Sequence, residues 1–164
     1  MSDTIKVLIE IPEGSRVKYE LNEDTQQMEV DRLMPTAMGY PINYGLVLGT
    51  HGEDGDALDA LVFLSERVMP GVVVKCQILG LLEMEDEAGV DHKLICVPAG
   101  AKIDPVCGAW SSLDDIPEAK KRQIKHFFEH YKDLEEGKWV KLKDWQGVEE
   151  ARRVLMSAQE RKEN

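Results

Sequence analysis

Asp54-Gly55-Asp56-Ala57-Leu58-Asp59 runs directly into an apolar segment, residues 58–64, so the chain passes here from a polar turn into a strand. The turn places three carboxylates beside a glycine. Two unit charges about 4 Å apart repel by roughly 4 kcal/mol at an effective dielectric near 20, so converging carboxylates require cations. Oxygen ligands favour magnesium, manganese or calcium over zinc. The stretch predicts either a divalent metal site or, where the side chains point apart into water, a solvated acidic turn.

Short strand-like segments surround this turn along the first two-thirds of the chain. Turn residues such as Pro12-Glu13-Gly14 and Asn22-Glu23-Asp24 separate them. Strands at such close spacing favour a barrel or a sandwich over a parallel sheet with crossover helices. The expected strands are residues 6–11, 17–21, 28–32, 44–49, 58–64, 72–82 and 93–97.

The apolar spacing becomes helical in the last third of the chain. Asp114 and Asp115 are the expected cap of a first helix, which contains Pro117 in its first turn. A further strand is expected over residues 138–142. No repeat or linker interrupts the chain, so residues 1–164 are expected to form a single domain: a small β-barrel with two C-terminal helices against it. The expected helix faces are Ile124, Phe127, Phe128, Tyr131 and Leu134 in the first helix, and Val148, Ala151, Leu155 and Ala158 in the second.

Composition and charge limit the classes of function. A chain of 164 residues, 43% of them hydrophobic, is large enough for one domain with a substantial core. The net charge of −11 argues against a nucleic-acid or anionic-membrane surface, but it allows a small phosphate site lined by metal ions and a few cations. No segment approaches 18 apolar residues, and Met1-Ser2-Asp3-Thr4 shows no signal core. We therefore expect a cytoplasmic protein that binds neither nucleic acid nor membrane.

Residues that bind zinc are poorly arranged in this sequence. Cys76, Cys96 and Cys107 are widely spaced and form no CxxC pair, which predicts neither a disulfide nor a zinc–thiolate site. His126 and His130 stand four residues apart on the first expected helix, but the glutamate of an HExxH motif is missing. A surface or interface pair is favoured over a catalytic zinc site.

Further acidic and basic residues have two interpretations each. Asp86-Glu87-Ala88-Gly89-Val90-Asp91 lies between two apolar segments, which is typical of a hairpin turn. Glu10 and Glu20 alternate with apolar neighbours, as on a solvated sheet face. Arginine binds phosphate through a planar fork, lysine as a point charge, and tyrosine as a neutral donor. Each basic or phenolic residue of this kind is ordinary by itself. They are Lys18, Arg32, Tyr40, Tyr44, Tyr131 and Lys132.

Seven short motifs follow one another in a particular order over roughly residues 5–160 of the chain. The series resembles that of the soluble family I inorganic pyrophosphatases, and it is most similar to their bacterial single-domain type. Seven motifs in order are far more specific than any one of them. They are Ile9-Glu10-Ile11-Pro12, Lys18-Tyr19-Glu20, Asp31-Arg32, Tyr40-Pro41-Ile42-Asn43-Tyr44-Gly45, Asp54-Gly55-Asp56-Ala57-Leu58-Asp59, Asp86-Glu87-Ala88-Gly89-Val90-Asp91-His92-Lys93 and His126-Phe127-Phe128-Glu129-His130-Tyr131-Lys132.

The resemblance implies a fold, an activity and an assembly. The fold is α+β and mainly β, a five-stranded OB-like closed barrel with two flanking helices. The activity is Mg²⁺-dependent hydrolysis of pyrophosphate to two phosphates, by direct in-line attack of a metal-activated water. Three to four Mg²⁺ ions would occupy the substrate-loaded site, with Mn²⁺ as a second candidate metal. The assembly is a homohexamer, in which the pair of His126 and His130 could lie at a subunit contact.

The resemblance also implies a role for individual residues. Asp54, Asp59 and Asp91 resemble ligands of a first metal, and Asp59 would bridge to a second. Asp86 and Asp91 would hold a third ion, and Glu10 would act on a further one through water. Asp56 lies between two ligand aspartates and is the expected proton acceptor. Phosphate binding is implied for Lys18, Arg32, Tyr44, Lys93, Tyr131 and Lys132, and an inner hydrogen-bonding role for Glu20 and Tyr40.

Two residues depart from the family pattern. Ala57 stands where proline is usual, so the loop loses a fixed φ angle. Gly39 stands where many bacterial relatives have a larger residue, from which we expect a looser wall beside Tyr40. Two other functions remain open: hydrolysis of another phosphate compound such as a nucleoside triphosphate, although no P-loop is present, and non-catalytic binding of metal or phosphate.

Overall fold

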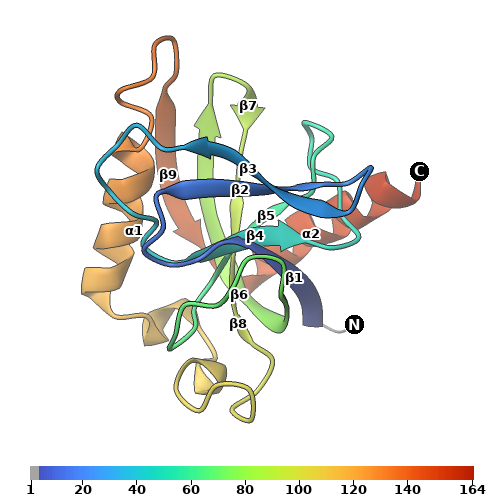
Figure 1. The fold of residues 1–164 in the computed structure, drawn as a ribbon. Helices are drawn as coiled ribbons and strands as arrows, with labels where there is room; N and C mark the ends of the chain where they lie inside the picture. The colour runs from blue at the N-terminus through green and yellow to red at the C-terminus, as the bar shows by residue number, and fades with distance from the viewer. Residues whose placement is uncertain (1–3) are drawn as a thin grey trace.

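The computed structural model describes residues 4–164, and Figure 1 shows the fold. Residues 1–3, part of the segment in which we expect no signal sequence, lie outside the described residues. No helix within residues 4–164 is long and apolar enough to span a membrane. The elements are β1 (Thr4–Ile11), β2 (Val17–Asn22), β3 (Gln27–Leu33), β4 (Asn43–Val47), β5 (Asp59–Val62), β6 (Val73–Asp86), β7 (Gly89–Val90), β8 (Lys93–Pro98), the 3₁₀ turns η1 (Cys107–Ala109) and η2 (Leu113–Asp115), α1 (Glu118–His130), β9 (Val140–Gln146) and α2 (Val148–Glu163).

Five strands close into a barrel in the order β1, β4, β5, β8 and β6, and β6 pairs back to β1. The pair β5–β8 is parallel and the other neighbouring pairs are antiparallel, so the barrel is mixed. Alternating side chains face the interior, as in β1, where Val7 and Ile9 are fully buried. The predicted five-stranded closed barrel is confirmed.

The strand expected at residues 72–82 is longer in the structure, since β6 continues to Asp86. The first part of β6 pairs with β1 and β8 in the barrel, and its last residues pair with β7 and β9. The register shifts beside Gly80, where a Cβ would stand 2.5 Å from the carbonyl oxygen of Gln146. The glycine thus lets β9 approach closely, and the extension of β6 carries Asp86 beyond the barrel.

Strands β2 and β3 form a separate hairpin that crosses in front of the barrel in Figure 1. Backbone hydrogen bonds hold its base: the Gly14 N–H donates to the Tyr40 carbonyl at 2.7 Å, and the Tyr40 N–H donates to the Ser15 carbonyl at 2.9 Å. A Cβ on Gly39 would lie only 2.5 Å from the Gly14 carbonyl oxygen. The looser wall that we expected at Gly39 is therefore wrong, because glycine permits a tight backbone contact there.

Two C-terminal helices pack against the sheet, as predicted: α1 contacts β9, and α2 contacts β6. Helix α1 begins after the expected cap, because Asp114 and Asp115 belong to η2, where Asp115 forms a capping box with Ser112. Leu134, expected on the helix face, lies beyond the helix end and is exposed. The other faces are buried as expected, through Ile124, Phe127 and Phe128 in α1 and Ala151, Leu155 and Ala158 in α2.

Candidate active site

A cavity of about 710 Å³ lies between the β2–β3 hairpin, one end of the barrel and the loop that follows α1. Every residue to which the sequence assigned a role lines this single cavity, although the residues come from distant parts of the chain. The carboxylates are Glu10, Glu20, Asp54, Asp56, Asp59, Asp86 and Asp91, and the cations and phenols are Lys18, Arg32, Lys93, Lys132, Tyr40, Tyr44 and Tyr131.

Lys93 lies at the centre of the acidic side of the cavity. Asp59 begins β5 and Lys93 begins β8, and the two are partners in the parallel pair. The Lys93 ammonium donates to Asp59 Oδ2 at 2.6 Å, to Asp91 Oδ1 at 2.9 Å and to the Tyr44 hydroxyl at 2.9 Å. Its side chain is almost fully buried. Burial favours the neutral amine, but the adjacent carboxylates outweigh it and hold the pKa of Lys93 well above its ordinary value.

Asp91 and Glu10 are among the cavity carboxylates whose pKa values are raised. Burial raises the pKa of Asp91 to about 6, against the lowering effect of Lys93. Glu10 on β1 is also buried, and its Oε2 accepts a hydrogen bond from the Leu21 N–H at 3.1 Å. Burial, with a smaller contribution from Asp59, raises the pKa of Glu10 to about 7. Because these carboxyl groups are poorly solvated and lie near other acids, a bound cation would stabilise their charged forms.

The acidic turn at residues 54–59 is compact. The Asp56 N–H donates to Asp54 Oδ1 at 3.0 Å, and the Gly52 N–H donates to the Asp56 carbonyl at 2.6 Å. Gly55 has φ of 89°, a left-handed conformation that glycine adopts without strain. Partial burial, followed by repulsion from Asp54 and Asp59, raises the pKa of Asp56. The stretch is thus an ordinary turn and an acidic wall of the cavity at once.

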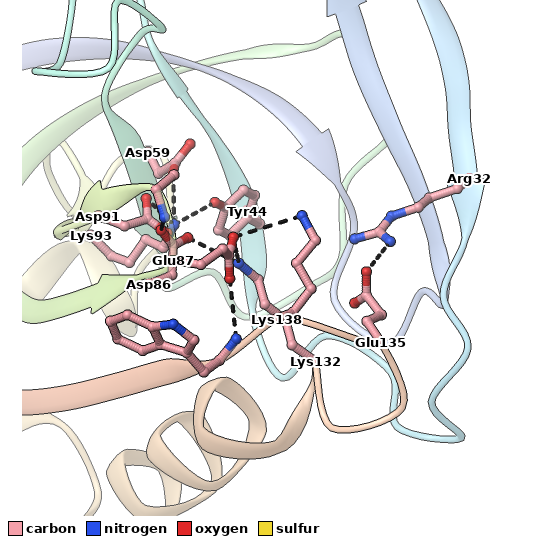
Figure 2. A network of polar contacts seen from close by, with 12 residues as sticks. Arg32, Tyr44, Asp59, Asp86, Glu87, Asp91, Lys93, Lys132, Glu135 and Lys138 are labelled. Carbon is pink, nitrogen blue, oxygen red and sulfur yellow. Dashed lines mark hydrogen bonds and ion pairs between the residues drawn. The ribbon is translucent and has the colours of Figure 1, made fainter.

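Basic residues line the cavity from the hairpin and from the loop after α1, and Figure 2 shows Arg32 and Lys132 among them. Lys18 and Arg32 are cross-strand partners in the β2–β3 pair, and Arg32 forms an ion pair with Glu135. Lys132 donates to Asp86 Oδ2 at 2.9 Å. The cavity therefore has an acidic side and a basic side, which suits a phosphate compound bound together with cations.

Aromatic packing fixes the phenols at the cavity floor. The Tyr40 ring lies 4.6 Å from the Phe127 ring between centroids, and Tyr131 lies 5.2 Å from the same Phe127 ring. Tyr44 meets Tyr40 edge-on at 5.4 Å. Burial raises the pKa of Tyr40, Tyr44 and Tyr131, so the three hydroxyls stay protonated and can donate hydrogen bonds.

Asp31, Glu135 and Lys138 line the cavity although the sequence assigned them no role, and Glu87 lies beside Lys138 at its edge. Asp31 forms an ion pair with Lys18 at 3.3 Å. Glu87 accepts a hydrogen bond from the Trp139 N–H at 3.2 Å and so lies beside the loop that follows α1. Asp31 and Glu87 stand inside motifs that the sequence singles out. Glu135 gives no such signal, because its partner Arg32 lies 103 residues away along the chain.

His126 and His130 lie on α1 outside the lining of this cavity. Their rings are 4.7 Å apart, and His130 Nδ1 lies 2.8 Å from Asp133 Oδ2. The histidine pair is therefore separate from the site of the carboxylates.

The donor set of the cavity fits hard divalent cations, because all its acidic ligands are oxygens. Within residues 4–164, no three Asp, Glu, His or Cys side chains are already gathered so as to hold one ion. The Lys93 ammonium lies between Asp59 and Asp91 and forms an ion pair with each. A positive charge thus already stands between the two carboxylates that the resemblance assigns to one metal.

A closed mixed barrel whose cavity sets carboxylates against lysine, arginine and tyrosine is an arrangement suited to an enzyme that hydrolyses a phosphate compound. Comparison with known proteins agrees with this class. The family model described as inorganic pyrophosphatase matches residues 7–163. The chain belongs to the inorganic pyrophosphatase family, as its motifs predicted.

Individual relatives match over most of their length. The inorganic pyrophosphatase of Aquifex pyrophilus is 51% identical over 149 residues, which cover 91% of this chain and 84% of the relative. That of Gluconobacter oxydans is 48% identical over 158 residues, 96% of this chain and 91% of the relative. The solved structure of the Helicobacter pylori inorganic pyrophosphatase superposes with a TM-score of 0.95 at 44% identity and covers 99% of this chain and 95% of its own.

Proposed function

We propose that this chain hydrolyses inorganic pyrophosphate to two phosphates in a Mg²⁺-dependent reaction. The observation that carries the proposal is the single cavity in which every residue of the seven motifs with an assigned role meets. Family membership supports the reaction, since the relatives are named for it.

Binding of the substrate is assigned to the basic and phenolic side of the cavity. Pyrophosphate carries several negative charges, which lysine and arginine neutralise, while tyrosine hydroxyls donate hydrogen bonds to the phosphate oxygens. Lys18 and Arg32 would hold one phosphate from the hairpin, because they face each other across β2 and β3. The residues that we assign to phosphate binding are Lys18, Arg32, Tyr44, Lys93, Tyr131 and Lys132.

The metal ions are assigned to the acidic side. Asp54, Asp59 and Asp91 would hold the first ion, with Asp59 shared by a second; Asp86 and Asp91 would hold a third, and Glu10 would act through water on a further one. When bound, Mg²⁺ supplies positive charge against the phosphate oxygens and makes a coordinated water more acidic. We propose three to four ions in the substrate-loaded site and Mn²⁺ as a substitute.

Asp56 is the proposed proton acceptor for direct in-line attack of water on a phosphorus atom. Its raised pKa makes it a better base than an ordinary aspartate at neutral pH. It is exposed at the cavity and is not needed as a primary ligand. Glu20 and Tyr40 would hold the inner hydrogen-bonding shell, since both line the cavity beside the phosphate-binding residues.

We further propose that residues 1–164 act as a single domain in a cytoplasmic homohexamer. Pyrophosphate is its partner in this proposal, and nucleic acid and membrane are not, in keeping with the net charge of −11. Sedimentation at low and high protein concentration would test the hexamer, and a monomer at every concentration would contradict it.

The decisive test of the reaction is phosphate release from pyrophosphate. We expect release with Mg²⁺ and none with a chelator, and we expect Asp59→Asn to raise the Mg²⁺ concentration that the reaction requires. ATP serves as the competing substrate, because faster release from ATP would favour a nucleoside triphosphatase. If Mg²⁺ binds in a titration but phosphate release does not exceed the metal-free control, the chain is a binding module and the proposed enzymatic activity is excluded.

A further inference from the structure

Glu135 forms a long-range contact that the proposed mechanism does not use. It lies in the loop after α1, and its carboxylate forms an ion pair with Arg32 on β3, as Figure 2 shows. The Glu135 side chain is 11% exposed, whereas the Arg32 side chain is 38% exposed. The neighbouring Leu134 and Glu136 are exposed, so the loop turns this one acid inward.

The hydrogen bonding of the Glu135 carboxylate is incomplete. Glu135 Oε1 meets the Arg32 guanidinium, but no donor among residues 4–164 bonds to Oε2, which is buried. A buried carboxylate oxygen without a donor destabilises a fold. A buried acid with an unsatisfied oxygen does not serve stability at this position. The unsatisfied oxygen therefore points to a role in the site.

The ion pair leaves much of Arg32 available to a ligand. A guanidinium has five N–H donors in a planar fork, and the contact with Glu135 uses the Nη1 atom. The hydrogen bond with Glu135, opposed by burial, raises the pKa of Arg32, so the group stays charged. Both residues line the same cavity, and although Arg32 Nε lies 4.0 Å from Asp31 Oδ2, the guanidinium keeps N–H groups that can bind a phosphate while Glu135 holds Nη1.

The same loop is fixed at its other side to the β6–β7 turn. Glu87 Oε1 accepts the Trp139 N–H at 3.2 Å, and Glu87 Oε2 lies 3.7 Å from the Lys138 ammonium. Residues 131–139 thus span the cavity from the β6–β7 turn to the β2–β3 hairpin. The contact of Glu135 with Arg32 is the ion pair that joins this loop to the hairpin.

We propose that Glu135 is the positioning residue of Arg32: it orders the guanidinium toward the cavity before a phosphate binds. The proposal rests on the proposed function, because it requires Arg32 to bind a phosphate of the substrate. A freely moving arginine must be ordered at each binding event, and a preordered one need not be. Glu135 therefore lowers the KM for pyrophosphate and has little effect on kcat, since Arg32 binds substrate and transition state alike.

The test compares Glu135→Gln, Glu135→Ala and the matched control Glu136→Gln, which removes the same charge from the next, exposed residue. We expect the KM for pyrophosphate to rise about tenfold in Glu135→Ala and about threefold in Glu135→Gln, which keeps one acceptor, with kcat within about twofold. Glu136→Gln should keep the parent KM. Thermal melts of all variants with a chelator show whether each is folded.

A double-mutant cycle separates positioning from a general structural effect. In an Arg32→Ala background, Glu135→Gln should leave the KM unchanged, because no guanidinium remains to be ordered. An equal rise of KM in both backgrounds, or a parent KM in Glu135→Gln, would overturn the proposal while pyrophosphate hydrolysis stands. Calorimetric binding of imidodiphosphate, a non-hydrolysable analogue, is measured on the same proteins. A parent chain without turnover would therefore refute the proposed function, and the analogue affinities would still decide the role of Glu135.

Discussion

Replacing Lys93 with methionine is the sharpest perturbation that the site offers. Methionine keeps an unbranched stem and removes the ammonium that stands between Asp59 and Asp91. The stem packs beside the rings of Tyr44 and Phe128, where the ammonium lies 5.3 and 5.9 Å from the ring centroids. The substitution therefore tests the charge with little change in packing volume.

Two opposite effects are expected. Breaking a buried ion pair costs about 3–5 kcal/mol, and we take the lower end, about 3 kcal/mol, because buried carboxylates can neutralise themselves by protonation. The Asp59 and Asp91 side chains are also 28% and 19% exposed, which allows partial hydration. A chain of this length loses about 2–4 °C of Tm per kcal/mol, so the metal-free variant should melt about 6–12 °C below the parent.

The same substitution removes the cation that competes with Mg²⁺ for these carboxylates. At an effective dielectric near 20, unit charges about 4 Å apart interact by roughly 4 kcal/mol. We expect at least about 1.4 kcal/mol of this to appear in the titration as a tenfold lower Kd for Mg²⁺. The gap in Tm between Lys93→Met and the parent should therefore narrow as Mg²⁺ is added. Phosphate release should fall, since a phosphate-binding residue is lost.

Thermal melts with a chelator and with increasing Mg²⁺, together with calorimetric Mg²⁺ titrations, measure both effects. Lys75→Met is the matched control, because Lys75 is an exposed lysine on β6, and it should keep the parent values. An unchanged or weaker Mg²⁺ titration in Lys93→Met would refute the competition. A Tm gap that persists at saturating Mg²⁺ would refute it as well.

Three further substitutions test other parts of the molecule. Asp56→Asn should lower phosphate release at least about a hundredfold and keep the Mg²⁺ titration, and parent turnover would show that Asp56 is not the base. Gly39→Ala should lower stability by about 1–3 kcal/mol in urea melts, because its Cβ meets the Gly14 carbonyl oxygen; an unchanged midpoint would contradict this close contact. Burial opposes a low pKa at Asp104, but hydrogen bonds from Ser65 and two further backbone N–H groups lower it, so the carboxylate stabilises the fold at neutral pH. The stability lost in Asp104→Asn should shrink as the pH falls below roughly 4, and a constant difference down to pH 3 would disprove the linkage.

The barrel could be predicted from the sequence because strand spacing and turn residues are local signals. Its closure was implied only by the family resemblance, because it depends on β6 pairing back to β1 and on the parallel pair of β5 with β8, which join distant segments. The length of β6 was also underestimated. The apolar run ends at Leu82, but the strand continues to Asp86 because β9 supplies hydrogen-bonding partners from the far end of the chain.

The acids of the candidate site were recognisable for the same local reason, because Asp54–Asp59 and Asp86–Asp91 are dense in carboxylates. Their positions relative to the cations were not. Lys93 reaches Asp59 only through the register of a parallel pair, and Arg32 reaches Glu135 across 103 residues. A sequence motif shows which groups are present, whereas the ion pairs among them are set by topology.

Topology also separates the residues of the acidic stretch 54–59. Asp54 and Asp56 form a closed turn whose hydrogen bonds need no metal, whereas Asp59 already belongs to β5 and faces Lys93. One buried ammonium, that of Lys93, contacts Asp59 of this stretch together with Asp91. In the proposed function, a divalent cation would replace this ammonium beside the carboxylates, and Lys93 would become available to a phosphate. One side chain would thus link the stability of the metal-free protein to the proposed chemistry of the site.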